Sequence, residues 1–170
     1  MKHVIGKDSK TTLTQIKKED IQPNAIDLRL DRVFKINDKQ FEISNEHKKH
    51  RGSFEINPDK NDYFELSSGV YEIVFENIIN VGENETGFVI TRSTFIRNGC
   101  FLISGLYDSG YVGAMTAALH ITTAPAKIKK GTRIGQYLSF DAEMLYKYNG
   151  SYGFDGAGNP KEDEKKYHSI

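Results

Sequence analysis

The sequence has very few of the residues that mark secreted or membrane proteins. Its 170 residues include one cysteine, Cys100, which excludes an internal disulfide and predicts a reducing, cytoplasmic location. No apolar run approaches the ~20 residues of a transmembrane helix, and the polar first residues predict no signal peptide. Lys plus Arg and Asp plus Glu both number 23, so the net charge is zero. We therefore expect neither a nucleic-acid partner nor a membrane partner.

Long amphipathic helices are also lacking, and short strand-like segments dominate. Ile26, Leu28 and Leu30 alternate with polar residues, which is the period of a half-buried strand. Turn residues separate further apolar segments at 54–56, 63–66, 70–75, 87–91, 101–103, 114–121, 126–128 and 133–140. Among these strand-like segments, residues 94–97 form a brief break of helical character, and Gly99 follows them as a cap. This pattern predicts an all-β fold, as a sandwich, a distorted jelly roll or a β-barrel.

The chain divides into three segments by composition. Residues 1–20 are polar and predict an arm or a short helix, and residues 21–148 carry the predicted strands of a single β domain. Residues 149–170 begin with a glycine-rich stretch, which fits a flexible tail or a lid over a ligand. Residues 44–52 are charged and predict a solvated loop. His47 and His50 lie there beside lysines, which makes them a poor set of metal ligands.

The stretch 104–113, S-G-L-Y-D-S-G-Y-V-G, is the first candidate for a functional site. Asp108 lies between two apolar strand-like segments, and Tyr107 and Tyr111 flank it. The glycines allow a tight turn and a close approach to a ligand. An ordinary Asp-Ser-Gly turn fits the same residues, so the stretch alone leaves both interpretations open.

Four other stretches add chemistry to this hairpin. Arg92 and Ser93 open the short helical turn, where a cation, a hydroxyl and free N–H groups favour an anion. Gln136 follows a glycine turn into a strand, and Asp27 interrupts an apolar strand. The glycine-rich tail offers backbone N–H groups that suit phosphates. Each of these also fits a plain surface residue, a strand-edge acid or a tail.

Together these five stretches, in this order, resemble the dUTPase and dCTP deaminase superfamily. The matching stretches are I-Q-P-N-A-I-D-L-R-L (21–30), T-R-S-T-F-I-R-N-G (91–99), G-L-Y-D-S-G-Y-V-G (105–113), K-G-T-R-I-G-Q-Y (130–137) and N-G-S-Y-G-F-D-G-A-G (149–158). The resemblance implies a homotrimer of all-β subunits. It also implies an enzyme that binds dUTP or dCTP with Mg²⁺.

The resemblance assigns the reaction centre to the third and fifth stretches. Asp108 matches the acid that activates the attacking water. Tyr111 matches the ring that packs on the deoxyribose and excludes a ribose 2′-hydroxyl. Phe154 matches the tail ring that closes over the base, and Gly153 gives it room.

The same resemblance assigns the triphosphate to the other three stretches. The groups that hold the phosphates match Arg92, Ser93, Arg97 and Gln136. Asp27 matches the acid that lies near the magnesium ion and contacts it through water. The Mg²⁺ ion and the cationic groups would offset the charge of the triphosphate.

Two positions depart from the superfamily patterns. Deaminases of this type carry a glutamate five residues after the last glycine of the third stretch, and that position is Ala118 here. Alanine transfers no proton, and we interpret the nearby His120 as structural. The ligand set of zinc deaminases is missing as well. The tail arginine of dUTPases is replaced by Asn149. The interval between Arg92 and Asp108 is also short, which leaves the choice of base open.

The sequence therefore predicts a Mg²⁺-assisted diphosphatase that converts dUTP to dUMP and pyrophosphate. Alternatives are a dCTP deaminase, a bifunctional deaminase and diphosphatase, and a diphosphatase that also takes dCTP. Ala118 argues against the two deaminating versions. A further alternative is a non-catalytic, nucleotide-binding regulatory trimer, which Asn149 favours and Asp108 opposes.

Overall fold

Strands make up nearly all of the regular structure in the computed structural model, which describes residues 1–168. The elements are β1 (Thr12–Leu13), η1 (Lys18–Asp20), β2 (Ile26–Ile36), β3 (Glu42–Ile43), β4 (Lys48–Lys49), β5 (Ser53–Ile56), β6 (Tyr63–Leu66), β7 (Gly69–Asn80), β8 (Glu85–Thr91), α1 (Ser93–Ile96), β9 (Cys100–Ile103), β10 (Val112–Ile121), β11 (Ala126–Lys129), β12 (Arg133–Asp141), η2 (Glu162–Glu164) and α2 (Lys165–His168). No helix in residues 1–168 is long and apolar enough to cross a membrane.

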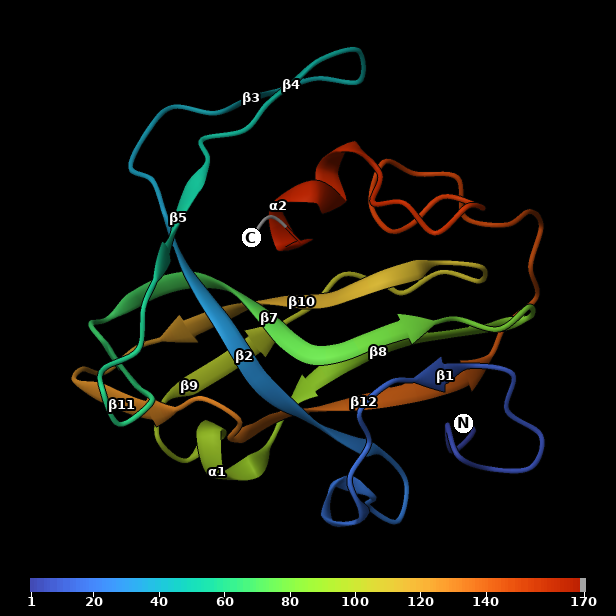
Figure 1. Ribbon diagram of the computed structural model, residues 1–170, viewed down its shortest axis with the longest axis horizontal. Helices are drawn as coiled ribbons and strands as arrows, with labels where there is room; N and C mark the ends of the chain where they lie inside the picture. Colours follow the sequence, from blue (N-terminus) through green and yellow to red (C-terminus); the bar gives the residue numbers. More distant parts are fainter. Residues whose placement is uncertain (169–170) are drawn as a thin grey trace.

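The main sheet is antiparallel and curls into a nearly closed barrel (Figure 1). Its strands follow the order β8-β12-β2-β7-β10-β9, with β1 beside β7 and β5 beside β2. Side chains close the gap between the two outer strands, since the Thr91 hydroxyl accepts a hydrogen bond from Leu102 N (2.7 Å) and the Ser104 hydroxyl accepts one from Val89 N (2.9 Å). The predicted all-β, barrel-like fold is confirmed.

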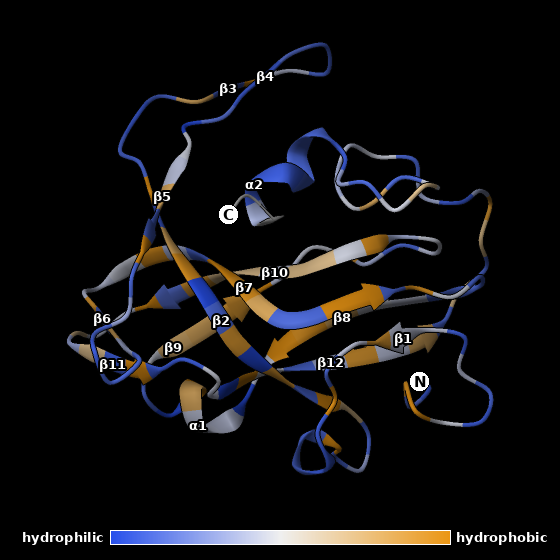
Figure 2. Cartoon of the chain, viewed as in Figure 1, coloured by the Kyte–Doolittle hydropathy of each residue, from blue (hydrophilic) through white to orange (hydrophobic). Residues whose placement is uncertain are grey.

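The barrel interior follows from the alternation of apolar residues along the strands. Ile26, Leu28 and Leu30 of β2 are fully buried, as are Ile73 of β7 and Leu119 of β10. Figure 2 shows the apolar residues concentrated on the barrel strands. Each fully buried aliphatic side chain contributes roughly 1.5–3 kcal/mol to folding. The alternation that predicted the strands therefore also forms the core.

Two segments lie outside the barrel wall. Residues 37–52 form a hairpin, with β3 paired to β4, that projects away from the body (Figure 1). Its side chains are largely exposed, as expected for a charged loop, although the short ladder between Glu42 and Lys49 was not predicted. The C-terminal segment 149–168 folds back over β10 and ends in α2.

A buried carboxylate, that of Glu85, helps to attach the N-terminal residues to the barrel, in addition to the pairing of β1 with β7. Its oxygens accept hydrogen bonds from the Thr11 hydroxyl (2.6 Å), Thr11 N (2.8 Å), Lys10 N (2.9 Å) and the Lys2 ammonium (3.1 Å). Burial acts to raise the pKa of Glu85, but these donors outweigh it and lower the pKa to about 2. The backbone carbonyl of Glu85 also accepts a hydrogen bond from the Ser109 hydroxyl (2.6 Å). The N-terminal arm and the turn after Asp108 thus share one anchor.

Replacing Glu85 with glutamine should remove a pH-dependent part of the stability. A pKa depressed from 4.5 to about 2 contributes stability above pH 4.5, and this contribution is lost as the pH falls toward 2. We expect Glu85→Gln to lower the free energy of unfolding at pH 7 by ~2–3 kcal/mol, with a gap to wild type that narrows below pH 4.5. Urea unfolding at several pH values measures this gap. A gap of constant size from pH 7 to pH 3 would contradict the assignment.

Candidate functional site

The hairpin that carries Asp108 is held rigidly although the acid itself is exposed. Gly87 and Tyr107 form a bridge between backbones, Gly110 N donates to Val81 O (3.0 Å), and Val81 N donates to Tyr111 O (2.8 Å). Gly110 adopts a φ of 82°, a left-handed conformation that favours glycine. A well-anchored turn therefore presents a solvent-accessible carboxylate, which a general base requires.

Tyr111 lies beside Asp108 in a cluster of aromatic rings. Only 8% of its surface is exposed, and its hydroxyl donates to Ala114 O (2.9 Å). Its ring contacts Tyr107 (5.7 Å between centroids) and Tyr148 (5.3 Å). Burial, and next the nearby charge of Glu164, raise the pKa of Tyr111, so its hydroxyl remains protonated. Asp108 and these rings line a cavity of about 240 Å³.

The C-terminal segment brings Gly153 and Phe154 to the same place. The buried carboxylate of Glu164 accepts hydrogen bonds from Ala114 N (2.7 Å) and Gly153 N (3.0 Å), and Phe154 N donates to Val112 O (2.6 Å). Gly153 has a φ of 85°, and a Cβ atom there would collide with Val112 O. The third and fifth stretches of the sequence thus form one unit, which we call the nucleoside half: Tyr107, Asp108, Tyr111, Gly153 and Phe154.

A second group of side chains gathers around Asp27, whose carboxylate is completely buried. One oxygen accepts a hydrogen bond from the Gln136 amide (2.9 Å). The other oxygen lies 3.2 Å from Nε of Arg92 and 3.4 Å from a guanidinium nitrogen of Arg133. Strand pairing places Asp27 directly opposite Gln136. Asp27 therefore lies within the sheet, between β2 and β12, and holds two cations and an amide together.

Ser93 and Arg97 complete this region on α1. Ser93 is exposed and directly follows Arg92, and its carbonyl accepts a hydrogen bond from Arg97 N (3.0 Å). Arg97 is also exposed and ends the helical turn. We call Asp27, Arg92, Ser93, Arg133 and Gln136 the anion cluster. Two guanidinium groups face a single buried carboxylate there, so one positive charge is left to attract an anion. The net positive charge of this cluster suits a phosphate chain.

The two groups do not meet within one chain. Gln136 pairs with Ile90 on β8, whereas the Asp108 hairpin joins the same strand at Gly87. Three residues of strand separate these positions by about 10 Å, and Asp108 lies beyond Gly87. Within residues 1–168, the Asp108 side chain has no hydrogen bond or ion pair to the anion cluster.

A resident metal site is missing from the part of the chain that the structure describes. No group of three or more His, Cys, Asp or Glu side chains in residues 1–168 is placed to hold a metal ion. Both oxygens of Asp27 already contact Arg92, Arg133 or Gln136. A protein-only Mg²⁺ site therefore does not fit these residues, whereas an ion bound mainly by substrate phosphates does.

Sequence reasoning missed two charged residues of these regions, Glu164 and Glu72, and it did not connect a third, Arg133, with Asp27. Glu164 lies in a run of lysines and acids that reads as solvated, yet it is fully buried. The sequence offers Arg133 only as a replacement for the cation missing at Asn149, because its contact with Asp27 depends on the fold. Glu72 lies on β7 directly opposite Ala118, the position where a deaminase would carry its glutamate. Their partners are distant in sequence, so no local pattern identifies them.

Comparison with known proteins assigns the chain to a family. The family model described as dCTP deaminase-like matches residues 2–141. The deoxyuridine 5′-triphosphate nucleotidohydrolase of Methanocaldococcus jannaschii is 33% identical over 153 residues, which cover 88% of this chain and 97% of that protein. A probable deoxyuridine 5′-triphosphate nucleotidohydrolase of Methanosarcina acetivorans is 29% identical over 136 residues, with 78% and 80% covered.

Solved structures agree on the fold. The 2′-deoxycytidine 5′-triphosphate deaminase of Agrobacterium tumefaciens superimposes with a TM-score of 0.58 at 15% identity, over 76% of this chain and 43% of that longer chain. A mutant dUTPase of the Staphylococcus aureus phage phi11 gives a TM-score of 0.50 at 9% identity, over 82% and 95% of the two chains. With its family match, its archaeal relatives and its barrel, the chain belongs to the dCTP deaminase-like family of the dUTPase superfamily.

Proposed function

We propose that the protein is a dUTP diphosphatase, which hydrolyses dUTP to dUMP and pyrophosphate. The observation that carries this proposal is the exposed carboxylate of Asp108 at the edge of an aromatic cavity, beside the buried ring of Tyr111. The archaeal relatives that the chain matches over most of its length carry names for the same reaction. Ala118 supports hydrolysis over deamination, because it leaves β10 without a carboxylate at that position.

In this proposal Asp108 is the general base. It accepts a proton from a water molecule that attacks the α-phosphorus in line with the leaving pyrophosphate. Such a base contributes ~10²–10⁴-fold to the rate, and holding the water in line supplies much of the remaining acceleration. The Tyr111 ring packs against the deoxyribose and leaves no room for a 2′-hydroxyl. Phe154 closes over the base from the tail, and Gly153 allows the backbone to approach Val112.

The triphosphate binds the anion cluster. Arg92, Arg133 and the Gln136 amide offer donors that Asp27 keeps in place, and Ser93 adds a hydroxyl. Arg97 lies one turn further along α1 and reaches the outer phosphates. Fixed donors of this kind stabilise the negative charge that develops on the leaving pyrophosphate. Arg133 also replaces the cation that is missing at Asn149.

Mg²⁺ is the proposed cofactor, and it arrives with the substrate. The ion neutralises phosphate charge when it is bound, and its ligands are mainly phosphate oxygens and water. Asp27 contacts the ion only through water, and it also holds Arg92 and Gln136 in the positions from which they bind the phosphates. We keep the cytoplasm as the proposed location, because Cys100 is unpaired and buried.

A homotrimer is the proposed assembly, with each site shared between copies. The separation of the nucleoside half from the anion cluster within one chain supports this proposal, since a nucleotide has to contact both. Exposed apolar side chains on the outer barrel strands also support it, namely Phe88 and Ile90 of β8 and Phe101 and Ile103 of β9. Such a patch is typical of an interface.

The Asp108 side chain decides between an enzyme and a non-catalytic nucleotide-binding protein. We expect Asp108→Asn to lower pyrophosphate release from dUTP at least 100-fold, because the general base is lost. The affinity for dUMP should change less than twofold, since shape and hydrogen-bonding capacity persist. Asp38→Asn, in the exposed hairpin, serves as the control. If wild type and Asp108→Asn are equally inactive, the non-catalytic alternative is favoured, whereas equal and measurable turnover would show that Asp108 is not the general base.

Asp27→Asn should destabilise the protein more than an ordinary loss of charge does. Removing the carboxylate leaves Arg92 and Arg133 facing each other without compensation, so we expect unfolding to become easier by ~3 kcal/mol. The KM for dUTP should rise as well. Asp31→Asn, which breaks a half-exposed pair with Lys130, should cost below ~1 kcal/mol. Urea unfolding compares the two variants, and equal costs would refute the central role of Asp27.

Shared sites can be tested by mixing two inactive proteins. Asp108→Asn lacks the base but keeps the anion cluster, and Gln136→Ala has the opposite defect. After joint refolding of equal amounts, a trimer with shared sites should regain about a quarter of wild-type activity, because each half of a site is intact half the time. A mixture that stays as inactive as its components would show that each site belongs to one chain.

A further inference from the structure

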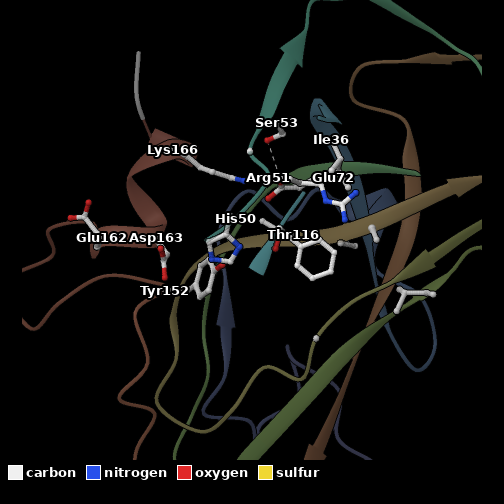
Figure 3. A pocket seen from close by; sticks show the side chains of 16 residues that line it. Ile36, His50, Arg51, Ser53, Glu72, Thr116, Tyr152, Glu162, Asp163 and Lys166 are labelled. Carbon is white, nitrogen blue, oxygen red and sulfur yellow. Dashed lines mark hydrogen bonds and ion pairs between the residues drawn. The ribbon is translucent and has the colours of Figure 1, made fainter. Parts of the chain in front are cut away.

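A cavity of about 720 Å³ lies on the outer side of the barrel, over β7 and β10 (Figure 3). Its floor consists of small side chains of β10, including Ala118 and Thr116. Glu72 of β7 and Ile103 of β9 flank Ala118 through strand pairing. The hairpin residue Arg51 and the C-terminal residue Lys166 line its sides. The volume falls within the range of small-molecule sites.

This cavity continues the nucleoside half. It shares Gly105, Thr116 and Tyr152 with the smaller cavity of Asp108 and Tyr111. At about 240 Å³, the smaller cavity is below the usual size of a ligand site, so a nucleotide with its sugar on Tyr111 has to extend beyond it. Tyr152 lies at the boundary, and aromatic rings there offer a surface on which a base stacks.

Charge favours the base over the triphosphate in the larger cavity. Three carboxylates line it, those of Glu72, Glu162 and Asp163, against two permanent cations, Arg51 and Lys166. A triphosphate carries several negative charges and is repelled by such a set. The anion cluster has the opposite balance, so the phosphates bind there.

Glu72 lies beside Ala118 in this floor. Its side chain is 20% exposed, and it pairs across the strands with Ala118. The Tyr167 hydroxyl donates to one oxygen (2.5 Å), and the Lys166 ammonium (2.6 Å) and the Ser53 hydroxyl (3.3 Å) donate to the other. A carboxylate held by these donors is an acceptor only, and it keeps capacity for a further hydrogen bond.

The backbone N–H of Thr116 donates a hydrogen bond to the Tyr107 hydroxyl (3.0 Å). Ala118 lies two residues further along β10, on the same face of the sheet, and Glu72 lies beside it on β7. A base that extends along this face from a sugar on Tyr111 would bring its far edge, position 4, toward Glu72. Cytosine carries an amino donor there, and uracil carries a carbonyl acceptor. The carboxylate suits the amino group, and the adjacent Lys166 ammonium suits the carbonyl.

We propose that this cavity binds the pyrimidine ring, that Glu72 accepts a hydrogen bond from the 4-amino group of cytosine, and that the protein therefore also converts dCTP to dCMP and pyrophosphate. The inference rests on the proposed diphosphatase function. The water oxygen bonds to the α-phosphorus, its proton passes to Asp108, and the bond to the bridging oxygen breaks with its electron pair on pyrophosphate. The bond between C4 and the amino nitrogen stays intact, because Ala118 offers no carboxylate for deamination.

The first experiment incubates the wild-type protein separately with dCTP and dUTP and measures pyrophosphate and ammonia. Pyrophosphate from both nucleotides without ammonia is the expected result. Pyrophosphate from dUTP alone would overturn this inference and leave the proposed function intact, and ammonia from dCTP would overturn the inference as well. If neither nucleotide is hydrolysed, both the proposed function and the dCTP activity fail.

The second experiment measures the affinities for dCMP and dUMP by calorimetric titration, so that recognition of the base is tested without catalysis. Glu72→Leu should weaken dCMP on the order of tenfold relative to dUMP, and Lys166→Met should shift the ratio in the opposite direction. Glu72→Gln, which keeps an acceptor oxygen, should lie between wild type and Glu72→Leu. Lys60→Met is the control, because this exposed lysine does not line the cavity. Equal losses for both nucleotides would mean that Glu72 only fastens α2, and would overturn the proposal.

Discussion

One buried carboxylate, that of Asp27, organises the part of the molecule that suits phosphates. It lies between β2 and β12 with no exposed surface, and it contacts two guanidinium groups and an amide. An isolated charge in that position would be strongly unfavourable, so the buried Asp27 carboxylate requires the donors of Arg92, Arg133 and Gln136. In turn, the carboxylate holds these three side chains in place. Three stretches that are far apart in the sequence are thereby fixed into one donor surface.

The geometry of the sheet also separates the two groups of candidate site residues. The anion cluster and the Asp108 hairpin join β8 at different positions, Ile90 and Gly87, and the strand between them is rigid. Glu164 anchors the C-terminal segment to β10, beside Tyr111 and on the side of the Asp108 hairpin. In the proposed homotrimer, a complete site forms where the anion cluster of one copy faces the nucleoside half of another. The exposed apolar strands of the barrel offer the surface for that contact.

Much of the fold was predictable because it depends on local alternation. Ile26, Leu28 and Leu30 marked β2, and the turn residues marked most of the later strands within a few residues. Asp108 and Tyr111 stood out because glycines flank them. The sequence predicted Asp27 to be an acid at the edge of a strand. Its burial was not predictable, because it depends on partners such as Arg133, about a hundred residues away. Glu85 and Glu164 were unpredictable for the same reason. Their neighbours in sequence are polar, and only the tertiary structure encloses them.

The cross-strand position of Glu72 is a second example of a distant effect. The sequence shows a missing carboxylate at Ala118, and strand pairing places a different carboxylate beside that position. Its ion pair with Lys166 connects the floor of the cavity to the C-terminal segment. In the proposed base site, the choice of base depends on two elements that no single stretch of sequence joins.

The most direct test of the shared site is a crystal structure with α,β-imido-dUTP and Mg²⁺, which binds without being cleaved. The account predicts the triphosphate on Arg92, Ser93 and Gln136 of one copy and the deoxyribose on Tyr111 of another, with the Asp108 carboxylate facing a water near the α-phosphorus. A nucleotide held entirely by one copy, or with its phosphates away from the anion cluster, would contradict it.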